Sequence, residues 1–168
     1  MASKLPDRAI PAGEMPKIFI ALGANISSPL GPPDVTLRAA LAELAASGIG
    51  VFEVSSYYRT EAWPNPADPP FTNAVARIET ELQPLALLGL LHKVETAFGR
   101  KRSLPNAPRS LDIDLIDYRG QVAQGAVEIP HPRLTGRRFV LEPLAEIAPG
   151  WRHPVSGLTV EALLAALD

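Results

Sequence analysis

Segments with the apolar pattern of strands alternate along this chain with longer segments that repeat at the helical period. Residues 17–25, KIFIALGAN, form an apolar run that ends in a glycine-containing turn, and residues 51–60 and 71–82 are rich in β-branched and aromatic side chains. These features predict three strands. Residues 109–118, RSLDIDLIDY, alternate apolar and acidic positions, which predicts a fourth strand, and residues 119–127 supply a turn and a last short strand.

Leucines recur at the helical period between these strands. A first helix is expected after Asp34, which can cap it, and should stop near residues 47–48. A second helix follows Pro84 and ends at Gly99. The apolar stripes of these two helices are Leu37, Leu41 and Leu44, and Leu87, Leu91, Val94 and Phe98. The C-terminal part should form helices over residues 139–147 and 159–167, the latter capped by its first residue, a threonine.

The predicted order of elements, β-α-β-β-α-β followed by helices, is typical of a ferredoxin-like α+β fold. Such a core has an antiparallel sheet with both helices on one face, which leaves the other face free for a ligand. We expect residues 17–168 to form this single domain with C-terminal helical additions, because a chain of 168 residues is long enough to bury one core. Residues 1–16 lack periodicity and are expected to form a flexible N-terminal tail.

Composition narrows the class of protein. The chain is 46% hydrophobic and 20% charged, with a net charge of −2 and a pI near 5.9, which is typical of a globular protein and argues against a general nucleic-acid binder. It contains no cysteine, which excludes disulfides and thiolate metal sites. Residues 1–16 contain no apolar core of signal-peptide length, and no apolar run in the sequence is long enough to span a membrane. We therefore expect a cytoplasmic protein without membrane contact, and we expect a monomer.

Two acidic residues on one face of a strand are the main candidates for chemistry. Asp112 and Asp114 share a face because successive side chains of a strand alternate, and their carboxylates should lie roughly 6–7 Å apart and repel each other. A divalent cation between them would offset this repulsion. An amphipathic strand with acids on its wet face is the alternative, and the pattern alone does not decide between the two.

Basic residues upstream favour the cation and suggest a phosphate-bearing ligand. Arg100, Lys101, Arg102 and Arg109 lie just before the aspartates, where they could face a metal-bound polyphosphate, although a solvated basic loop would have the same sequence. No P-loop or dinucleotide-binding glycine pattern occurs, so a nucleotide would depend on metal and arginines for its phosphates. Mg²⁺ fits carboxylate and phosphate oxygens better than zinc does.

Several further side chains have more than one interpretation. Phe71 and Asn73 alternate on one strand face, where an amide could bind the edge of a heterocycle while a ring stacks on it. Phe71 and Phe139 would both be core on pattern alone. The histidines at 92, 131 and 153 are not spaced as a helical zinc pair, and an isolated histidine is more often structural than a ligand.

Several separated motifs resemble those of the 6-hydroxymethyl-7,8-dihydropterin pyrophosphokinases of folate biosynthesis. The motifs are IALGAN, SSYYRTEAW, FTNAVARIETEL, VETAFGR, PRSLDIDLIDY and IPHPRLTGRRFVLEPLAEIAP, and they occur in the family's order from Ile18 to about Pro154. PRSLDIDL combined with IPHPR is the most specific feature. The resemblance implies attack of the pterin's hydroxymethyl oxygen on the β-phosphorus of ATP, with release of AMP.

The same resemblance implies roles for individual residues. Asp112 and Asp114 would bind two Mg²⁺ ions, while Arg100 and Arg109 would stabilise charge on the transferred group. The implied ATP-binding set is Leu88, His92, Glu95, Arg100, Arg102, Arg109, Ile116, His131 and Arg137, and the implied pterin-binding set is Thr60, Trp63, Phe71, Asn73, Asp112 and Phe139. ATP and the pterin are therefore the expected small-molecule partners, and Mg²⁺ is the expected cofactor.

Two other functions remain compatible with the pattern. A ferredoxin-like module for single-stranded RNA would present Tyr57 and Tyr58 on its sheet, but the acidic pI and the absence of aromatic RNP patterns count against it. A two-metal nucleotidyltransferase also uses paired aspartates but forms a nucleotide ester. Pterin-dependent release of AMP would distinguish the pyrophosphokinase from both.

Overall fold

The computed structural model of the protein describes residues 16–100 and 109–168. Its elements are β1 (Ile18–Ala24), α1 (Pro33–Ala46), β2 (Gly50–Val54), β3 (Tyr58–Thr60), β4 (Phe71–Glu79), α2 (Pro84–Ala97), β5 (Asp112–Tyr118), the 3₁₀ helix η1 (Leu134–Gly136), α3 (Arg138–Ile147) and α4 (Val160–Ala165). The strands form one sheet in the order β2-β4-β1-β5, with antiparallel neighbours, and β3 also pairs with β4. This arrangement confirms the α+β class and the ferredoxin-like order.

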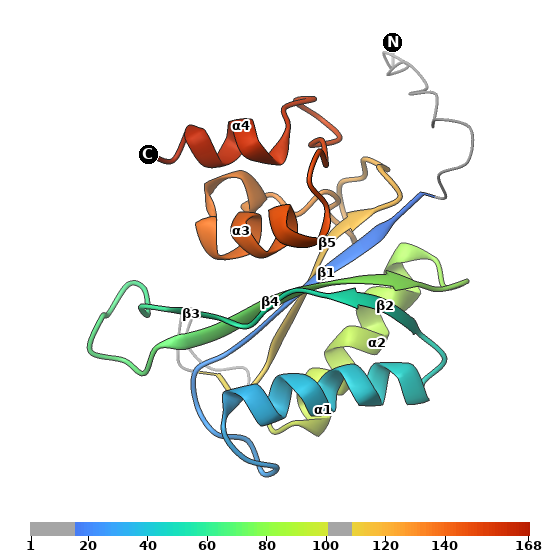
Figure 1. Ribbon diagram of the computed structural model, residues 1–168. Helices are drawn as coiled ribbons and strands as arrows, with labels where there is room; N and C mark the ends of the chain where they lie inside the picture. The colour runs from blue at the N-terminus through green and yellow to red at the C-terminus, as the bar shows by residue number, and fades with distance from the viewer. Residues whose placement is uncertain (1–15, 101–108) are drawn as a thin grey trace.

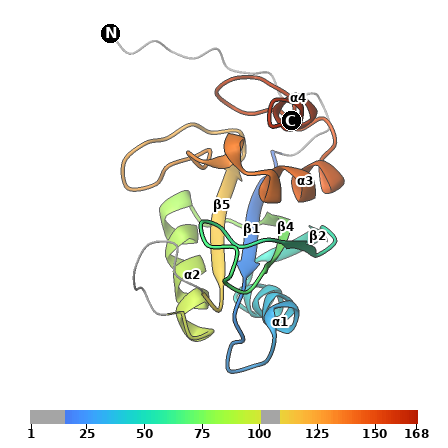
Figure 2. The ribbon, with the colours of Figure 1, turned by 90° about the vertical axis from the view of Figure 1, so that its left-hand side faces the viewer.

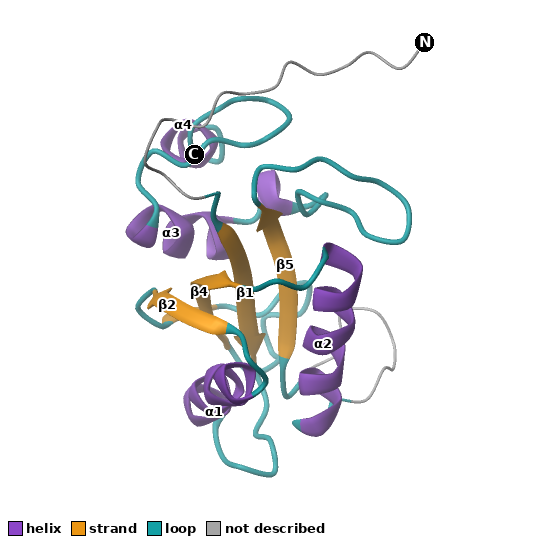
Figure 3. Ribbon diagram, turned by 90° about the vertical axis from the view of Figure 1, so that its right-hand side faces the viewer, coloured by secondary structure: helices purple, strands orange, loops and turns teal. Residues whose placement is uncertain are grey.

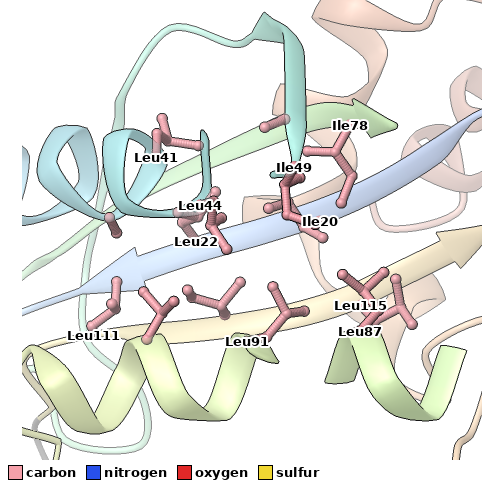
Figure 4. Packing of buried hydrophobic residues seen from close by; sticks show 14 of the residues in the cluster. Ile20, Leu22, Leu41, Leu44, Ile49, Ile78, Leu87, Leu91, Leu111 and Leu115 are labelled. Carbon is pink, nitrogen blue, oxygen red and sulfur yellow. The ribbon is translucent and has the colours of Figure 1, made fainter. Parts of the chain in front are cut away.

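The sheet lies between two helical layers, with α1 and α2 on one side and α3 and α4 on the other (Figures 1 and 2). The predicted stripes of α1 and α2 are buried against the sheet. Figure 4 shows Leu44 of α1 and Leu91 of α2 pointing toward β1 and β5, where Leu22 is also buried. Burial of these large apolar side chains is the main favourable contribution to folding of this layer.

The expectation of an open second face is wrong for part of the sheet. Phe19, Val75 and Ile116 are buried there in a second apolar cluster with Leu141 and Leu144 of α3. The C-terminal helices cover this end because three large apolar side chains would otherwise face water. Figure 3 shows α3 and α4 across the sheet from α1 and α2. The other end of the same face stays accessible, and it carries the candidate site.

The strand predicted over residues 51–60 is interrupted. β2 shifts register between Val51 and Glu53 and ends at Val54, and pairing with β4 resumes at Tyr58. Between them, the Ser55 hydroxyl accepts a hydrogen bond from the Val75 N–H at 3.0 Å. A side chain therefore replaces part of the backbone ladder, which a count of β-forming residues does not reveal.

The prediction of a last short strand through Val127 is also wrong. Arg119 and Gly120 make the expected turn, with φ angles of 55° and 69°. The segment that follows is a loop held by an isolated bridge between Ala123 and Ile129. A bridge of one residue pair is too short to continue the sheet.

Of the two helix caps predicted from the sequence, the structure confirms one. The Thr159 hydroxyl accepts from the Ala162 N–H at 3.1 Å and caps α4 as predicted. Asp34 does not cap α1, because the helix begins at Pro33 and has Pro32 at its N-cap. Proline in the first helical turn supplies the required φ angle without a side-chain cap. No helix in the described part of the chain combines the length and the hydrophobicity needed to cross a bilayer.

Candidate active site

Two rows of facing residues cross β4, β1 and β5 at the accessible end of the sheet. Antiparallel partners direct their side chains to the same face. The first row is Asn73, Gly23 and Asp112, and the second is Val75, Ala21 and Asp114. Because the central strand contributes only glycine and alanine, a polar amide and two carboxylates surround a floor without a large side chain.

A cavity of about 1010 Å³ opens above this floor. Its lining comes from β1, β3, β4, β5, the segment 133–137 and the start of α3. All of the predicted pterin-binding residues line it, namely Thr60, Trp63, Phe71, Asn73, Asp112 and Phe139. So do Asp114, Arg109 and Arg137 of the other predicted sets. Strands and loops that are far apart in the sequence therefore converge on one cavity.

Asn73 is held in place by the fold itself. Its side chain is 5% exposed, and its amide nitrogen donates to the Thr60 hydroxyl at 2.8 Å. Its carbonyl oxygen lies over Gly23, where an added Cβ would come within 2.9 Å of it. Phe71 is half-buried at the start of β4, and Phe139 is 39% exposed on α3. A neutral amide with aromatic neighbours suits the edge and face of a flat heterocycle.

Asp112 is surrounded by guanidinium groups. Arg100 Nη1 lies 2.6 Å from Asp112 Oδ1 and 2.7 Å from Glu95 Oε2. Arg109 Nη1 lies 3.1 Å from the other oxygen of Asp112, Oδ2. Charge-assisted contacts of this length are strong hydrogen bonds. Arg100 and Arg109 therefore both reach the carboxylate that faces Asn73 across Gly23.

Asp114 has longer contacts with basic side chains than Asp112 has. Arg137 Nη1 lies 3.4 Å from its Oδ2 atom, and His131 Nε2 lies 3.9 Å from the same oxygen. Burial, followed by the charge of Asp112, raises the pKa of Asp114 to about 7. Burial and the charge of Arg137 lower the pKa of His131 to about 4, so the imidazole is neutral at pH 7 and does not offset the acidic charge.

The aspartates fit Mg²⁺ better than they fit a metal held by protein atoms alone. Within residues 16–100 and 109–168, no group of three or more His, Asp or Glu side chains is placed to hold a metal ion. Asp112 and Asp114 supply carboxylate oxygens only. Mg²⁺ is commonly held by one or two carboxylates together with water and substrate phosphates, whereas structural zinc sites require four protein ligands.

Comparison with known proteins decides the family. The model of the 7,8-dihydro-6-hydroxymethylpterin-pyrophosphokinase family matches residues 19–149. The chain belongs to this family. A protein of Synechocystis named 2-amino-4-hydroxy-6-hydroxymethyldihydropteridine pyrophosphokinase is 43% identical over 89% of this chain and 75% of its own length. Proteins of the same name from Methylorubrum extorquens and Haemophilus influenzae are 40% and 36% identical, over 92% and 85% of this chain and 95% and 88% of their own lengths.

The resemblance to this pyrophosphokinase family predicted a set of ATP-binding residues in the chain, and not all of them line the cavity. Leu88, His92 and Glu95 fall on one stripe of α2, outside its lining. Ile116 is fully buried, and Arg102 lies outside the described residues. These predicted ATP-binding residues therefore do not lie with the predicted pterin-binding residues that line the cavity.

Glu95 contacts other protein groups. It is 2% exposed, and its Oε1 atom accepts from the Ile113 N–H at 2.8 Å while Oε2 binds Arg100. Burial raises the pKa of Glu95, although the Ile113 N–H and the charge of Arg100 oppose this shift. Glu95 thus connects α2 to β5 and directs Arg100 toward Asp112.

Several residues that line the cavity were not predicted from the sequence. Its lining also includes Ala21, Gly23, Glu61, Arg133, Thr135, Gly136 and Arg138. Ala21 and Gly23 could have been found from the sequence, because they are small residues on one face of a strand whose other residues are mostly bulky. Gly23 was instead expected in a turn. No sequence feature pointed to the basic residues at 133 and 138, since exposed arginines are common.

Proposed function

We propose that the protein transfers the pyrophosphoryl group of ATP to the hydroxymethyl group of 6-hydroxymethyl-7,8-dihydropterin, giving AMP and the pterin diphosphate for folate biosynthesis. The main support is the juxtaposition, across Gly23, of an amide suited to a heterocycle and a carboxylate bound by two arginines. The names of the curated relatives support the same reaction. The comparisons favour neither an RNA-binding module nor a nucleotidyltransferase.

The pterin would lie on the floor formed by Ala21 and Gly23. Asn73, oriented by Thr60, offers its amide to the polar edge of the ring system. Phe71 and Phe139 line the same cavity and can stack on the ring faces, and Trp63, which is 75% exposed, can fold over the ligand. This placement would direct the hydroxymethyl group toward Asp112.

The charged residues would bind the triphosphate. Two Mg²⁺ ions at Asp112 and Asp114 would neutralise phosphate charge and lower the pKa of the attacking hydroxyl. The hydroxymethyl oxygen then attacks the β-phosphorus, the bond from that phosphorus to the α,β-bridging oxygen breaks, and AMP leaves with the oxygen while the hydroxyl proton passes to solvent. Arg100 and Arg109 lie within reach of Asp112 and can stabilise the charge that develops on the transferred group.

Other members of the predicted set would act at the edge of the nucleotide. Arg137 and His131 adjoin Asp114 and are placed to contact phosphate. Leu88 and His92 could contact the nucleoside from α2. The proposed active unit is the monomer, which size-exclusion chromatography with light scattering would test, and the cytoplasmic location stays a prediction.

One assay tests the function. The protein is incubated with ATP, Mg²⁺ and the hydroxymethyl-dihydropterin, and AMP and the pterin diphosphate are quantified together by chromatography and ³¹P NMR. We expect equal amounts of both products, and no AMP when either pterin or Mg²⁺ is omitted. Formation of AMP without pterin, or of a nucleotide ester, would contradict the proposal.

A further inference from the structure

Arg133 lines the cavity but was not among the residues predicted from sequence. Its backbone is fixed, because its N–H donates to His131 Nδ1 at 3.1 Å and its carbonyl accepts from the Gly136 N–H at 3.3 Å. The next residue, Leu134, is fully buried and anchors the segment beneath α3. The exposed Arg133 side chain therefore starts from a fixed point at the edge of the cavity.

Among the described residues, the other arginines near the cavity all have carboxylate partners. Arg100 and Arg109 pair with Asp112, Arg137 pairs with Asp114, and Arg138 pairs with Glu142 and Asp168. The Arg133 guanidinium forms no ion pair and no hydrogen bond within the described ranges 16–100 and 109–168. It is thus a cavity cation whose charge is not already matched by an acidic side chain of that part of the chain.

This difference matters for binding an anion. A paired arginine must give up or share its carboxylate before it binds phosphate, and that loss reduces the net gain. An unpaired guanidinium bears no such cost and can bind phosphate oxygens through two parallel, charge-assisted hydrogen bonds. Arg133 is therefore suited to hold an anion before any protein ion pair rearranges.

Its place along the sheet indicates which anion. Arg133 follows His131, whose Nε2 atom lies 3.9 Å from Asp114, in the second row of the floor. Asn73, the candidate pterin ligand, lies in the first row with Gly23. Arg133 is thus associated with the Asp114 side of the cavity, where a polyphosphate would meet the second carboxylate.

We propose that Arg133 is a phosphate-binding residue that holds the nucleoside triphosphate in the ground state. This inference rests on the proposed function and adds a residue to its nucleotide site. A contact already formed in the ground state strengthens nucleotide binding and leaves kcat nearly unchanged. Arg133 thereby differs from Arg100 and Arg109, for which we propose contacts that strengthen in the transition state.

The test compares Arg133→Gln and Arg133→Lys with the wild-type protein and with Arg38→Gln. Arg38 is an exposed arginine of α1, on the face of the sheet away from the cavity, so it controls for the change in net charge. Calorimetry measures the Kd of a non-hydrolysable ATP analogue with Mg²⁺ at several salt concentrations. We expect Arg133→Gln to weaken binding about tenfold and to flatten the dependence of Kd on salt. Arg133→Lys should keep the salt dependence but only part of the affinity, because lysine retains the charge and lacks the two parallel donors. Arg38→Gln should match the wild type.

Steady-state kinetics separates the possible outcomes. The inference predicts a higher KM for ATP, with kcat and the KM for pterin changed less than about twofold. Unchanged nucleotide affinity in Arg133→Gln would overturn it, as would equal weakening of both substrates together with a lower Tm. Absence of pterin-dependent AMP release by the wild type would refute the proposed function alone, because the calorimetric comparison of nucleotide binding does not depend on turnover.

Discussion

The cavity has two sides that are built by different forces. On the pterin side, defined by Thr60, Phe71 and Asn73, neutral groups are oriented by strand register and by one partly buried hydrogen bond. On the phosphate side, defined by Arg109, Asp114 and Arg137 together with their partners, the geometry depends on ion pairs. The first side is therefore formed before a ligand arrives, whereas the second must redistribute its charges when a polyphosphate and Mg²⁺ bind.

Removal of a carboxylate should have the largest effect. Asp112→Ala is expected to lower kcat on the order of 10³-fold, because it removes a proposed Mg²⁺ ligand and leaves Arg100 and Arg109 without their shared anion. Steady-state assays at saturating ATP and pterin measure this change. The matched control is Asp34→Ala, an exposed acid on α1, which should behave as wild type. Near-normal turnover of Asp112→Ala would remove the basis of the proposed metal site.

Arg100→Ala should lower kcat about 100-fold, because Glu95 directs its guanidinium to the position where charge develops. The Kd of the ATP analogue should change far less, since the contact is proposed to strengthen in the transition state. Pre-steady-state and binding measurements on the same preparation separate the two quantities. An effect confined to nucleotide affinity would assign Arg100 to ground-state binding.

Gly23→Ala tests whether the pterin side is preformed. An added Cβ would lie 2.9 Å from Asn73 Oδ1 and would displace the amide, so the KM for pterin should rise about tenfold while the KM for ATP stays within about twofold. Gly89→Ala is the control, because a Cβ at Gly89 on α2 meets no atom within 4 Å and should stabilise the helix slightly. If Gly23→Ala weakened ATP and pterin equally, the two sides would not be separable.

Tyr58→Phe should have the smallest effect. The Tyr58 hydroxyl donates to Glu146, which also accepts from Ser56, and these bonds tie β3 to α3. Loss of the hydroxyl should cost about 1 kcal/mol of folding free energy or less, because the pair is largely exposed, and should raise the KM for pterin about twofold. Urea unfolding and kinetics measure both, with Tyr57→Phe as the control.

The same contact predicts a dependence of stability on pH. The hydrogen bond to Glu146 raises the pKa of Tyr58 to about 12, and it lowers the pKa of Glu146. The bond should therefore stabilise the fold fully between the ordinary pKa values of the two groups. Its contribution should fall as acid protonates Glu146, and again as the pH rises toward 12. A difference between Tyr58→Phe and wild type that did not shrink at low pH would contradict this account.

Regular repeats made the fold predictable. The leucine stripes of α1 and α2 and the alternation around Asp112 and Asp114 each specify a buried face, and the structure buries those faces. The break at Ser55 and the loop after Gly120 were missed, because each depends on a single side-chain hydrogen bond or on positive φ angles that propensities do not encode.

The candidate site residues were predicted mainly from motifs that resemble those of the family. The residues proposed for pterin all line the cavity. Thr60, Phe71, Asn73 and Asp112 lie on strands whose register the fold determines, whereas Trp63 lies in a loop and Phe139 on α3. Glu95, which the resemblance assigns to ATP, binds Arg100 and the Ile113 N–H in the structure, because a buried carboxylate needs internal partners. A role for Glu95 in binding ATP stays a prediction. Arg133 was missed because pairing between charges appears only in three dimensions.

The most direct test of the central claim is an anomalous diffraction experiment on crystals grown with Mn²⁺, a non-hydrolysable ATP analogue and the pterin. Mn²⁺ replaces Mg²⁺ at oxygen-ligand sites and gives an anomalous signal. We expect anomalous peaks beside the carboxylates of Asp112 and Asp114, with the pterin lying over Gly23 and contacting Asn73. A bound nucleotide without metal at these aspartates, or a pterin bound away from Asn73, would contradict the account.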